Sequence, residues 1–132
     1  IVEMLRDYAR TRPDAVAIRQ KRFGIWQPTT FADYWRRARH VGLGLRALGL
    51  APKGHVGVIS ENRIEWVLAQ LGAGIVGAVT VGVYPTSPAG EVAYVLDHAD
   101  VSIVVSEDQE QIDKIVEARA QLPKITRVIA LE

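Results

Sequence analysis

The stretch 55–88 most constrains the fold, because it contains a strand pattern, a helix pattern and a second strand pattern in succession. The run 55–60 (HVGVIS) is short, apolar and β-branched, which is typical of a buried strand. Asn62 and Glu65 then have the spacing of a helix N-cap and its capping box. The run 78–83 (AVTVGV) predicts the second strand. A strand–helix–strand crossover is the unit of a parallel sheet covered by helices, so the stretch predicts an α/β fold.

The glycines of this stretch match a nucleotide-binding motif by letter but not by position. Gly72, Gly74 and Gly77 satisfy GxGxxG. In a dinucleotide site such glycines follow a strand and open a helix, so that the pyrophosphate meets free N–H groups. Here they close a helix and lead into a strand. We therefore interpret them as residues of close helix–sheet packing.

The alternation of strand and helix patterns continues on both sides of this stretch. Thr30 and Asp33 begin the strongest helix pattern, and Gly49 ends it. Strands are predicted at 55–60, 78–83, 101–105 and 125–130, and helices at 30–48, 63–76, 88–98 and 108–122. Ser87 and Pro88 have the chemistry of an N-cap and a first helical residue.

Residues 1–10 form a short helical pattern, and residues 15–28 predict a small antiparallel hairpin around Lys21 and Arg22, at the edge of the sheet. We therefore expect one α/β domain over 1–132, with a mostly parallel sheet flanked by helices.

Composition narrows the function classes. With 16 basic and 15 acidic residues, the net charge of +1 gives no electrostatic case for nucleic acid. The absence of cysteine excludes disulfides and thiolate catalysis. No apolar run reaches the ~20 residues that a transmembrane helix needs. Because the chain starts at Ile1 and ends on a strand-like run, we expect it to be a piece of something longer.

No catalytic constellation is visible. His40, His55 and His98 are far apart, and none lies in a zinc-binding spacing. There is no GxSxG elbow and no GxxxxGK[ST] phosphate loop. Asp97 and Asp100 flank the start of a strand, where we interpret them as capping residues. We therefore predict no catalytic residue and no metal site.

Several runs taken together resemble a known family. They are WQPTT at 26–30, LGL.P.G.V.VIS.NR.EW at 48–66, G.V.V..YPT....EV.Y.L at 77–96, and Q..K at 111–114. In this order and spacing they resemble the N-terminal part of the adenylate-forming (AMP-binding) acyl-CoA synthetases. The similarity extends over nearly the whole chain from about Ala15, and the YPT run favours the long-chain fatty-acid–CoA ligases.

The resemblance implies a reaction that the longer protein performs. ATP and a fatty acid give an acyl-adenylate, with Mg²⁺ holding the phosphates, and CoA then takes the acyl group as a thioester. The ATP loop, the adenine motif, the ribose-binding Asp and the catalytic Lys of the family lie downstream of these residues. The resemblance thus implies an inactive fragment without cofactor of its own. We expect its partner to be the remainder of its chain, and we expect the longer protein to be cytoplasmic and to touch the membrane peripherally.

The resemblance also implies one binding site. Tyr84, Pro85, Thr86 and Ser87 leave the carboxyl end of a strand that we expect to be central, where open α/β sheets place ligands. In related synthetases this loop lies against the nucleotide end of CoA. Lys114 is the nearest match to a basic residue that meets the 3′-phosphate, and Tyr84 offers an aromatic edge to the adenine. The alternative is that Pro85 shapes a turn, Thr86 and Ser87 cap a helix, and Lys114 is solvated.

Two other classes of function stay open. A free-standing binding or regulatory module would show a carboxylate cluster or a glycine loop at the carboxyl end of a strand, and the sequence suggests neither. A structural or dimerising subdomain, including a homodimer, is compatible with the missing motifs.

We predict that the 132-residue chain neither hydrolyses ATP nor exchanges pyrophosphate, because every nucleotide-binding motif of the resembled family is missing from it. Assays of phosphate release and of pyrophosphate exchange check the two activities, and isothermal titration calorimetry checks the premise that the chain does not bind ATP. Micromolar ATP binding by the chain would contradict the prediction.

Overall fold

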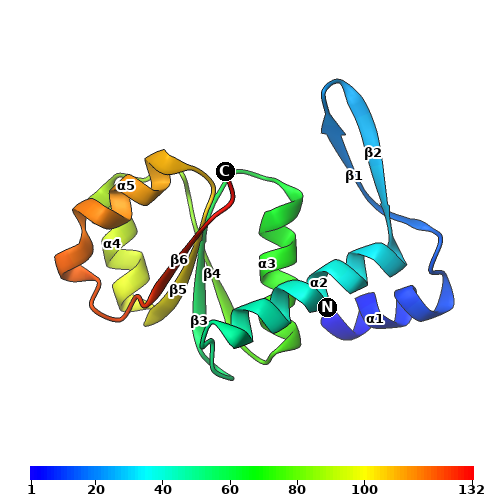
Figure 1. Cartoon of the computed structure of the whole chain (residues 1–132), viewed down its shortest axis with the longest axis horizontal. Helices are drawn as coiled ribbons and strands as arrows, with labels where there is room; N and C mark the ends of the chain where they lie inside the picture. The colour runs from blue at the N-terminus through cyan, green and yellow to red at the C-terminus, as the bar shows by residue number, and fades with distance from the viewer.

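The predicted alternation of strands and helices produces a four-stranded, wholly parallel sheet in the computed structural model, which describes residues 1–132 (Figure 1). The strand order is β4-β3-β5-β6. The strands are β3 (His55–Ile59), β4 (Val79–Val83), β5 (Val101–Ser106) and β6 (Arg127–Ala130). The central strands β3 and β5 are buried almost throughout, as expected for strands covered on both faces. The predicted α/β fold is confirmed.

Helices cover both faces of this sheet. On one face lie α4 (Ala89–His98) and α5 (Gln109–Glu117), and on the other lies α3 (Ile64–Ile75), backed by α2 (Phe31–Ala47) and α1 (Val2–Thr11) (Figure 1). One apolar cluster, which includes Leu96 and Val104, fills the space under α4 and α5. A second, which includes Leu45 and Val58, joins the opposite face to α2 and α3.

The tryptophans Trp35 and Trp66 are half-buried, as their inward helix positions predict. Trp66 packs against the second cluster, and Trp35 packs against a third one among α1, α2 and α3, which includes Leu5 and Leu68. None of the helices is both long enough and apolar enough to cross a bilayer.

Three local predictions are corrected. Asn62 does not cap α3: Arg63 occupies the N-cap position without a side-chain cap bond, and Glu65 bonds the Arg63 guanidinium instead. Ser87 does not cap α4 and Pro88 is not its first residue, since Pro88 takes the N-cap position without a side-chain bond. The helix predicted at 108–122 ends at Glu117 and continues as a short 3₁₀ turn, Arg119–Gln121. By contrast, the Thr30 hydroxyl accepts a hydrogen bond from the Asp33 N–H, as predicted.

The hairpin exists, but it does not lie at the edge of the parallel sheet. Strands β1 (Val16–Arg22) and β2 (Ile25–Thr30) form a separate two-stranded antiparallel sheet that projects beyond α2 (Figure 1). Its turn is Phe23–Gly24, one step beyond the predicted Lys21 and Arg22. The Phe31 N–H donates to the Ala15 carbonyl at 3.0 Å, which closes the base of the hairpin where α2 begins. The hairpin therefore belongs to the layer of N-terminal helices.

Strand β4 is an edge strand and not a central one. The chain leaves β3, adds β4 on one side and then crosses back to add β5 on the other side of β3. The exposed and half-exposed residues of β4, such as Val79 and Gly82, fit this position. The loop that follows β4 is thus open on one flank.

The two long helices approach each other through glycine. A Cβ built on Gly42 of α2 would lie 2.6 Å from the Gly72 carbonyl oxygen of α3, and one on Gly72 would lie 2.8 Å from the Gly42 nitrogen. The interpretation of Gly72 as a helix–sheet contact is therefore wrong, because it packs against a helix. Gly77 has a different role, since its φ of +76° forms the turn into β4.

We predict that Gly72→Ala lowers the free energy of unfolding by about 1–3 kcal/mol, because the added methyl group forces α2 away from α3. Urea denaturation measures the change. The matched control is Gly44→Ala on the facing helix α2, where a Cβ meets nothing within 4 Å. This control should leave stability unchanged or raise it by up to ~1 kcal/mol. Equal losses in both variants would contradict the close-packing explanation.

Candidate functional site

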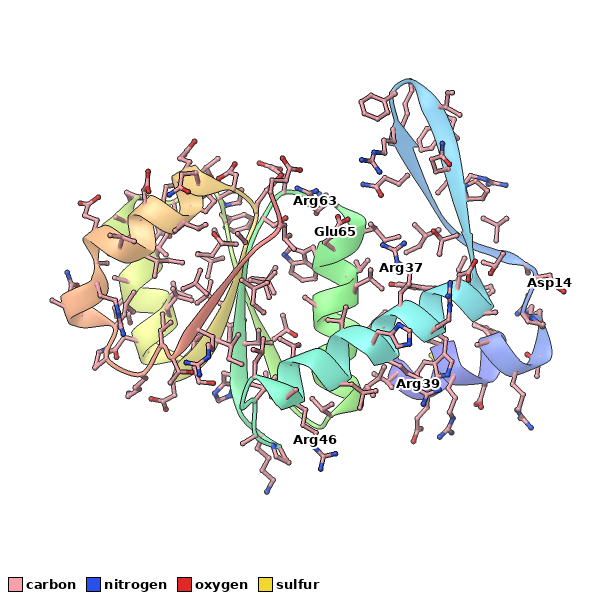
Figure 2. The ribbon with its side chains drawn as sticks, viewed as in Figure 1. Asp14, Arg37, Arg39, Arg46, Arg63 and Glu65 are labelled. Carbon is pink, nitrogen blue, oxygen red and sulfur yellow. The ribbon has the colours of Figure 1, made fainter.

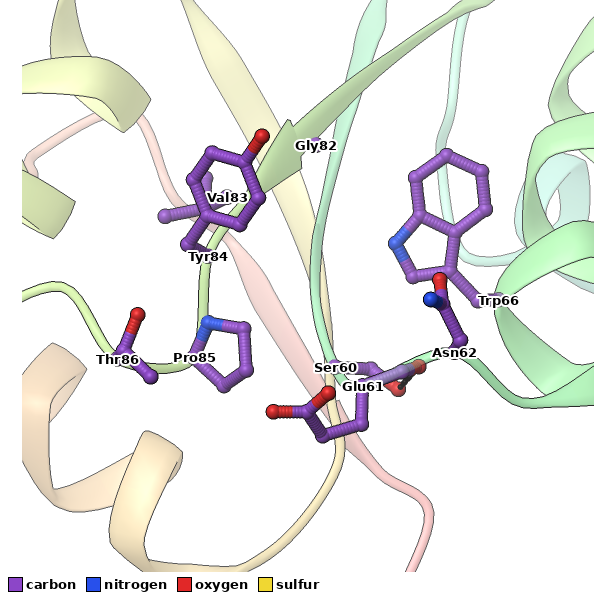
Figure 3. Close-up of a pocket in the computed structure, with 9 residues that line it drawn as sticks. All are labelled: Ser60, Glu61, Asn62, Trp66, Gly82, Val83, Tyr84, Pro85 and Thr86. Carbon is purple, nitrogen blue, oxygen red and sulfur yellow. Dashed lines mark hydrogen bonds between the residues drawn. The ribbon is translucent and has the colours of Figure 1, made fainter.

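A pocket of about 390 Å³ opens at the carboxyl ends of β3 and β4 (Figure 3). Its walls come from the β3–α3 connection, from α3, and from the end of β4 with the loop that follows. The lining residues are Ser60, Glu61, Asn62, Trp66, Gly82, Val83, Tyr84, Pro85 and Thr86. In parallel sheets the loops at this edge converge, which makes it the usual place for a ligand.

Two aromatic side chains stand on opposite walls of the pocket (Figure 3). Trp66 projects from α3, and Tyr84, with 79% of its area exposed, projects from the end of β4. Gly82 lies between them, and a Cβ there would come within 3.2 Å of the Trp66 ring. The missing side chain at Gly82 therefore leaves room for the indole beside the strand. A flat, apolar group of ring size suits the space between the two walls.

The predicted loop is a β-turn. The Ser87 N–H donates to the Tyr84 carbonyl at 3.1 Å, with Pro85 at the second position, where its fixed φ is favourable. Pro85 and Thr86 line the pocket with Tyr84, whereas Ser87 is buried and does not. Three of the four predicted loop residues therefore meet at the pocket, and Pro85 also shapes the turn.

Lys114 reaches the same loop from α5. Its Nζ donates to the Pro85 carbonyl at 2.5 Å and to Gln111 Oε1 at 2.9 Å, and lies 3.4 Å from Glu110 Oε1. The side chain is only 16% exposed. Lys114 thus holds the turn against α5 without lining the pocket, and it is not the freely solvated lysine of the alternative interpretation.

A partly buried ionic cluster beside the pocket was not predicted. Arg63 donates from Nε to Glu65 Oε2 at 2.9 Å and from Nη1 to Glu107 Oε1 at 3.2 Å, and its Nη1 lies 2.8 Å from Glu132 Oε1. Figure 2 shows Arg63 and Glu65 together at the start of α3. The second oxygen of Glu107 accepts the Glu61 N–H at 2.6 Å. One guanidinium therefore ties together the carboxyl ends of β3, β5 and β6.

The pKa values of Arg63 and Glu65 shift in the directions that favour their charged forms. The hydrogen bond to Glu65 raises the pKa of Arg63 above its ordinary value, against the opposing effect of burial. Burial would raise the pKa of Glu65, but the hydrogen bond from Arg63 and the other favourable contacts outweigh it, so that the net shift is downward. The structure contains no group of three or more His, Cys, Asp or Glu residues that could hold a metal ion.

The sequence did carry a signal for this cluster. Glu61, Glu107 and Glu132 each follow the end of a predicted strand, and parallel strands bring their carboxyl ends to one edge. Asp97 and Asp100 lie near the opposite edge, where both face Lys124 Nζ, at 3.8 and 2.5 Å. They form an ion-paired group around this lysine and make no capping hydrogen bond, so the interpretation as capping residues is wrong. The hydrogen bond from Lys124 lowers the pKa of Asp100.

Comparison with known proteins agrees with the fold. The family model described as AMP-binding enzyme matches residues 5–132. The chain belongs to this family. The N-terminal domain of FACL13 from Mycobacterium tuberculosis superposes with a TM-score of 0.89 at 26% identity, over 98% of this chain and 33% of that one.

Curated members of the family align over most of the chain. The long-chain-fatty-acid–CoA ligase ACSBG2 of Xenopus laevis is 30% identical over 129 residues, which are 98% of this chain and 18% of that protein. The long-chain-fatty-acid–CoA ligase heimdall of Drosophila melanogaster is 35% identical over 106 residues, 80% of this chain and 16% of that protein. The chain thus spans less than a fifth of the length of these relatives, and the resemblance seen in its motifs is confirmed.

We predict that Arg63→Ala lowers the free energy of unfolding by about 2 kcal/mol at neutral pH, because charged hydrogen bonds are lost from a mostly buried site. The pKa of Glu65 lies below its ordinary value of 4.5 in the folded chain. Its stabilisation is therefore present above pH 4.5 and is lost as the pH falls through the folded value.

Urea denaturation at neutral pH and at about pH 3 tests both statements, since the effect of the substitution should shrink in acid. Arg46→Ala is the matched control, because Arg46 is exposed and has no ion pair. A loss at Arg63 that does not change with pH would show that the cluster acts by packing and not by charge.

Proposed function

We propose that the chain is the N-terminal domain, residues 1–132, of a longer ATP-dependent long-chain fatty-acid–CoA ligase. The supporting observation is that relatives named for this activity align over as much as 99% of the chain. The longer enzyme joins a fatty acid to AMP at the expense of ATP and then transfers the acyl group to the thiol of CoA. On this proposal the 132 residues alone catalyse neither step.

The residues present do not fit ATP and Mg²⁺. Gly72 and Gly74 lie within α3 and Gly77 in the turn that follows, so none of them presents free N–H groups at the start of a helix. The carboxylates at the sheet edge are already paired with Arg63. We therefore assign ATP and Mg²⁺ to the remainder of the longer protein.

The pocket fits one part of CoA better than another. Trp66 and Tyr84 provide aromatic walls for the adenine ring. The only charged residue in the lining is Glu61, which disfavours a phosphate inside the pocket. We therefore propose that the adenine end of CoA lies against Tyr84, Pro85 and Thr86, and that its phosphates extend outward.

Ser87 and Lys114 complete the proposed CoA site. The Ser87 N–H closes the turn, and Lys114 holds the turn through the Pro85 carbonyl. A phosphate reaching Lys114 would replace Glu110, the longest of its three contacts. We also propose that the longer enzyme is cytoplasmic and touches the membrane peripherally.

We predict that Tyr84→Ala and Lys114→Ala in the longer enzyme raise the KM for CoA by roughly 5- to 100-fold, equivalent to ~1–3 kcal/mol. Fatty-acid-dependent pyrophosphate exchange should be unchanged, because that half-reaction precedes CoA. Steady-state kinetics with CoA as the varied substrate measures the first effect. Tyr94→Ala is the control, because Tyr94 is an exposed tyrosine on α4 that does not line the pocket. Unchanged CoA kinetics in both variants would show that Tyr84 and Lys114 have a structural role and do not bind CoA.

A further inference from the structure

The tip of the β1–β2 hairpin has a residue that the fold does not require. Phe23 is 91% exposed, and its φ of +50° lies in the left-handed region. With Gly24 at +80° it forms a two-residue hairpin turn, a position in which Asn, Asp or Gly is strongly preferred. A bulky side chain is strained there. The aromatic contact of Phe23 is with the Arg22 guanidinium, 5.4 Å from the ring centre. Neither the turn nor the core therefore explains a phenylalanine at this position.

Two other large apolar residues near Phe23 are also exposed. Ile25 and Trp26 expose 64% and 61% of their areas. Lys21 pairs with Trp26, so the two side chains share one face of the ribbon, whereas Arg22 pairs with Ile25 on the other face. Phe23, Ile25 and Trp26, named here the hairpin tip, form an apolar end of the ribbon. The ribbon projects beyond α2 (Figure 2), and Phe23 borders a hollow that also touches Arg37 of α2 and Glu65 of α3.

Positive charge surrounds this apolar end. Residues 15–30 contain Arg19, Lys21 and Arg22 and no acidic residue, whereas the whole chain has a net charge of only +1. Arg19 and Lys21 are two residues apart on β1, so they lie on the face that carries Trp26. None of the three cations is in an ion pair. The charge is therefore available to an external anion.

We propose that the hairpin Val16–Thr30 is a docking surface for an anionic lipid bilayer. Aromatic side chains settle at the level of the lipid headgroups, and apolar side chains insert slightly deeper. Cations near an anionic leaflet add attraction that decays within a Debye length. The projection of the ribbon lets the hairpin tip reach the surface before any helix does (Figure 1).

The same observations disfavour other macromolecules. A stable protein interface needs roughly 800 Å² from each partner, far more than three side chains at a ribbon tip provide. Single-stranded nucleic acid binds to open aromatic faces along a basic groove. Here Arg22 lies over the Phe23 ring, and the aliphatic Ile25 offers no stacking surface. The hairpin would be the surface that makes the peripheral membrane contact proposed above. The inference does not depend on ligase activity.

Vesicle sedimentation of the 132-residue chain tests the proposal. Vesicles of phosphatidylcholine mixed with phosphatidylserine should bind the chain, added salt should weaken the binding, and phosphatidylcholine alone should bind it much less. Phe23→Asn should lower the partition coefficient about tenfold. Lys21→Ser should lower it about fivefold, the equivalent of ~1 kcal/mol for one cation. Tyr94→Ser, which removes a 67% exposed aromatic from α4, should leave it unchanged.

Phe23→Asn also separates a binding defect from a folding defect. Asparagine suits the turn better than phenylalanine, so this variant should melt at the same temperature or higher while it loses vesicle binding. Absence of binding to the anionic vesicles overturns the proposal. It is equally overturned if Phe23→Asn binds like the unchanged chain, if Tyr94→Ser loses as much binding, or if the hairpin tip prefers single-stranded RNA to vesicles.

Discussion

The close approach of two helix backbones at Gly42 and Gly72 determines how the N-terminal helices and the hairpin are placed relative to the sheet. Helix α3 covers one face of the sheet and carries Trp66 into the pocket, and α2 rests on α3 through these glycines. Because the hairpin leads directly into α2, its direction also depends on this contact. Any side chain at the crossing would move the N-terminal layer as a unit, since packed interiors transmit such shifts. A contact between two residues without side chains therefore positions both the candidate pocket and the projecting ribbon.

The elements that the sequence predicted well are those fixed by local periodicity. Four strands and the helices between them follow from alternating apolar patterns that each segment contains in itself. The turn at Pro85 was also foreseen, because proline restricts its own backbone. The features that the sequence did not predict depend on contacts between distant segments. They are the edge position of β4, the separation of the hairpin from the parallel sheet, and the packing of Gly72 against a helix.

The candidate site shows the same division. Tyr84, Pro85 and Thr86 lie at the pocket because they follow a strand, which local pattern reveals. The bond from Lys114 to the Pro85 carbonyl joins residues 29 positions apart, and no local rule specifies it. Asn62 and Glu65 have the spacing of a capping box, yet Glu65 pairs with Arg63. A charged partner outcompetes a neutral cap, because ionised hydrogen bonds are the stronger ones.

The ionic cluster around Arg63 has a consequence for how the chain folds. Glu65 lies two positions away and is available early, whereas Glu107 is 44 positions away and Glu132 follows the last strand. The guanidinium therefore gains its complete set of partners only after β5 and β6 have joined the sheet. Closing such long loops is entropically costly and occurs late. The cluster therefore stabilises the sheet only after the sheet has formed. It should lower the rate of unfolding and change the rate of folding little.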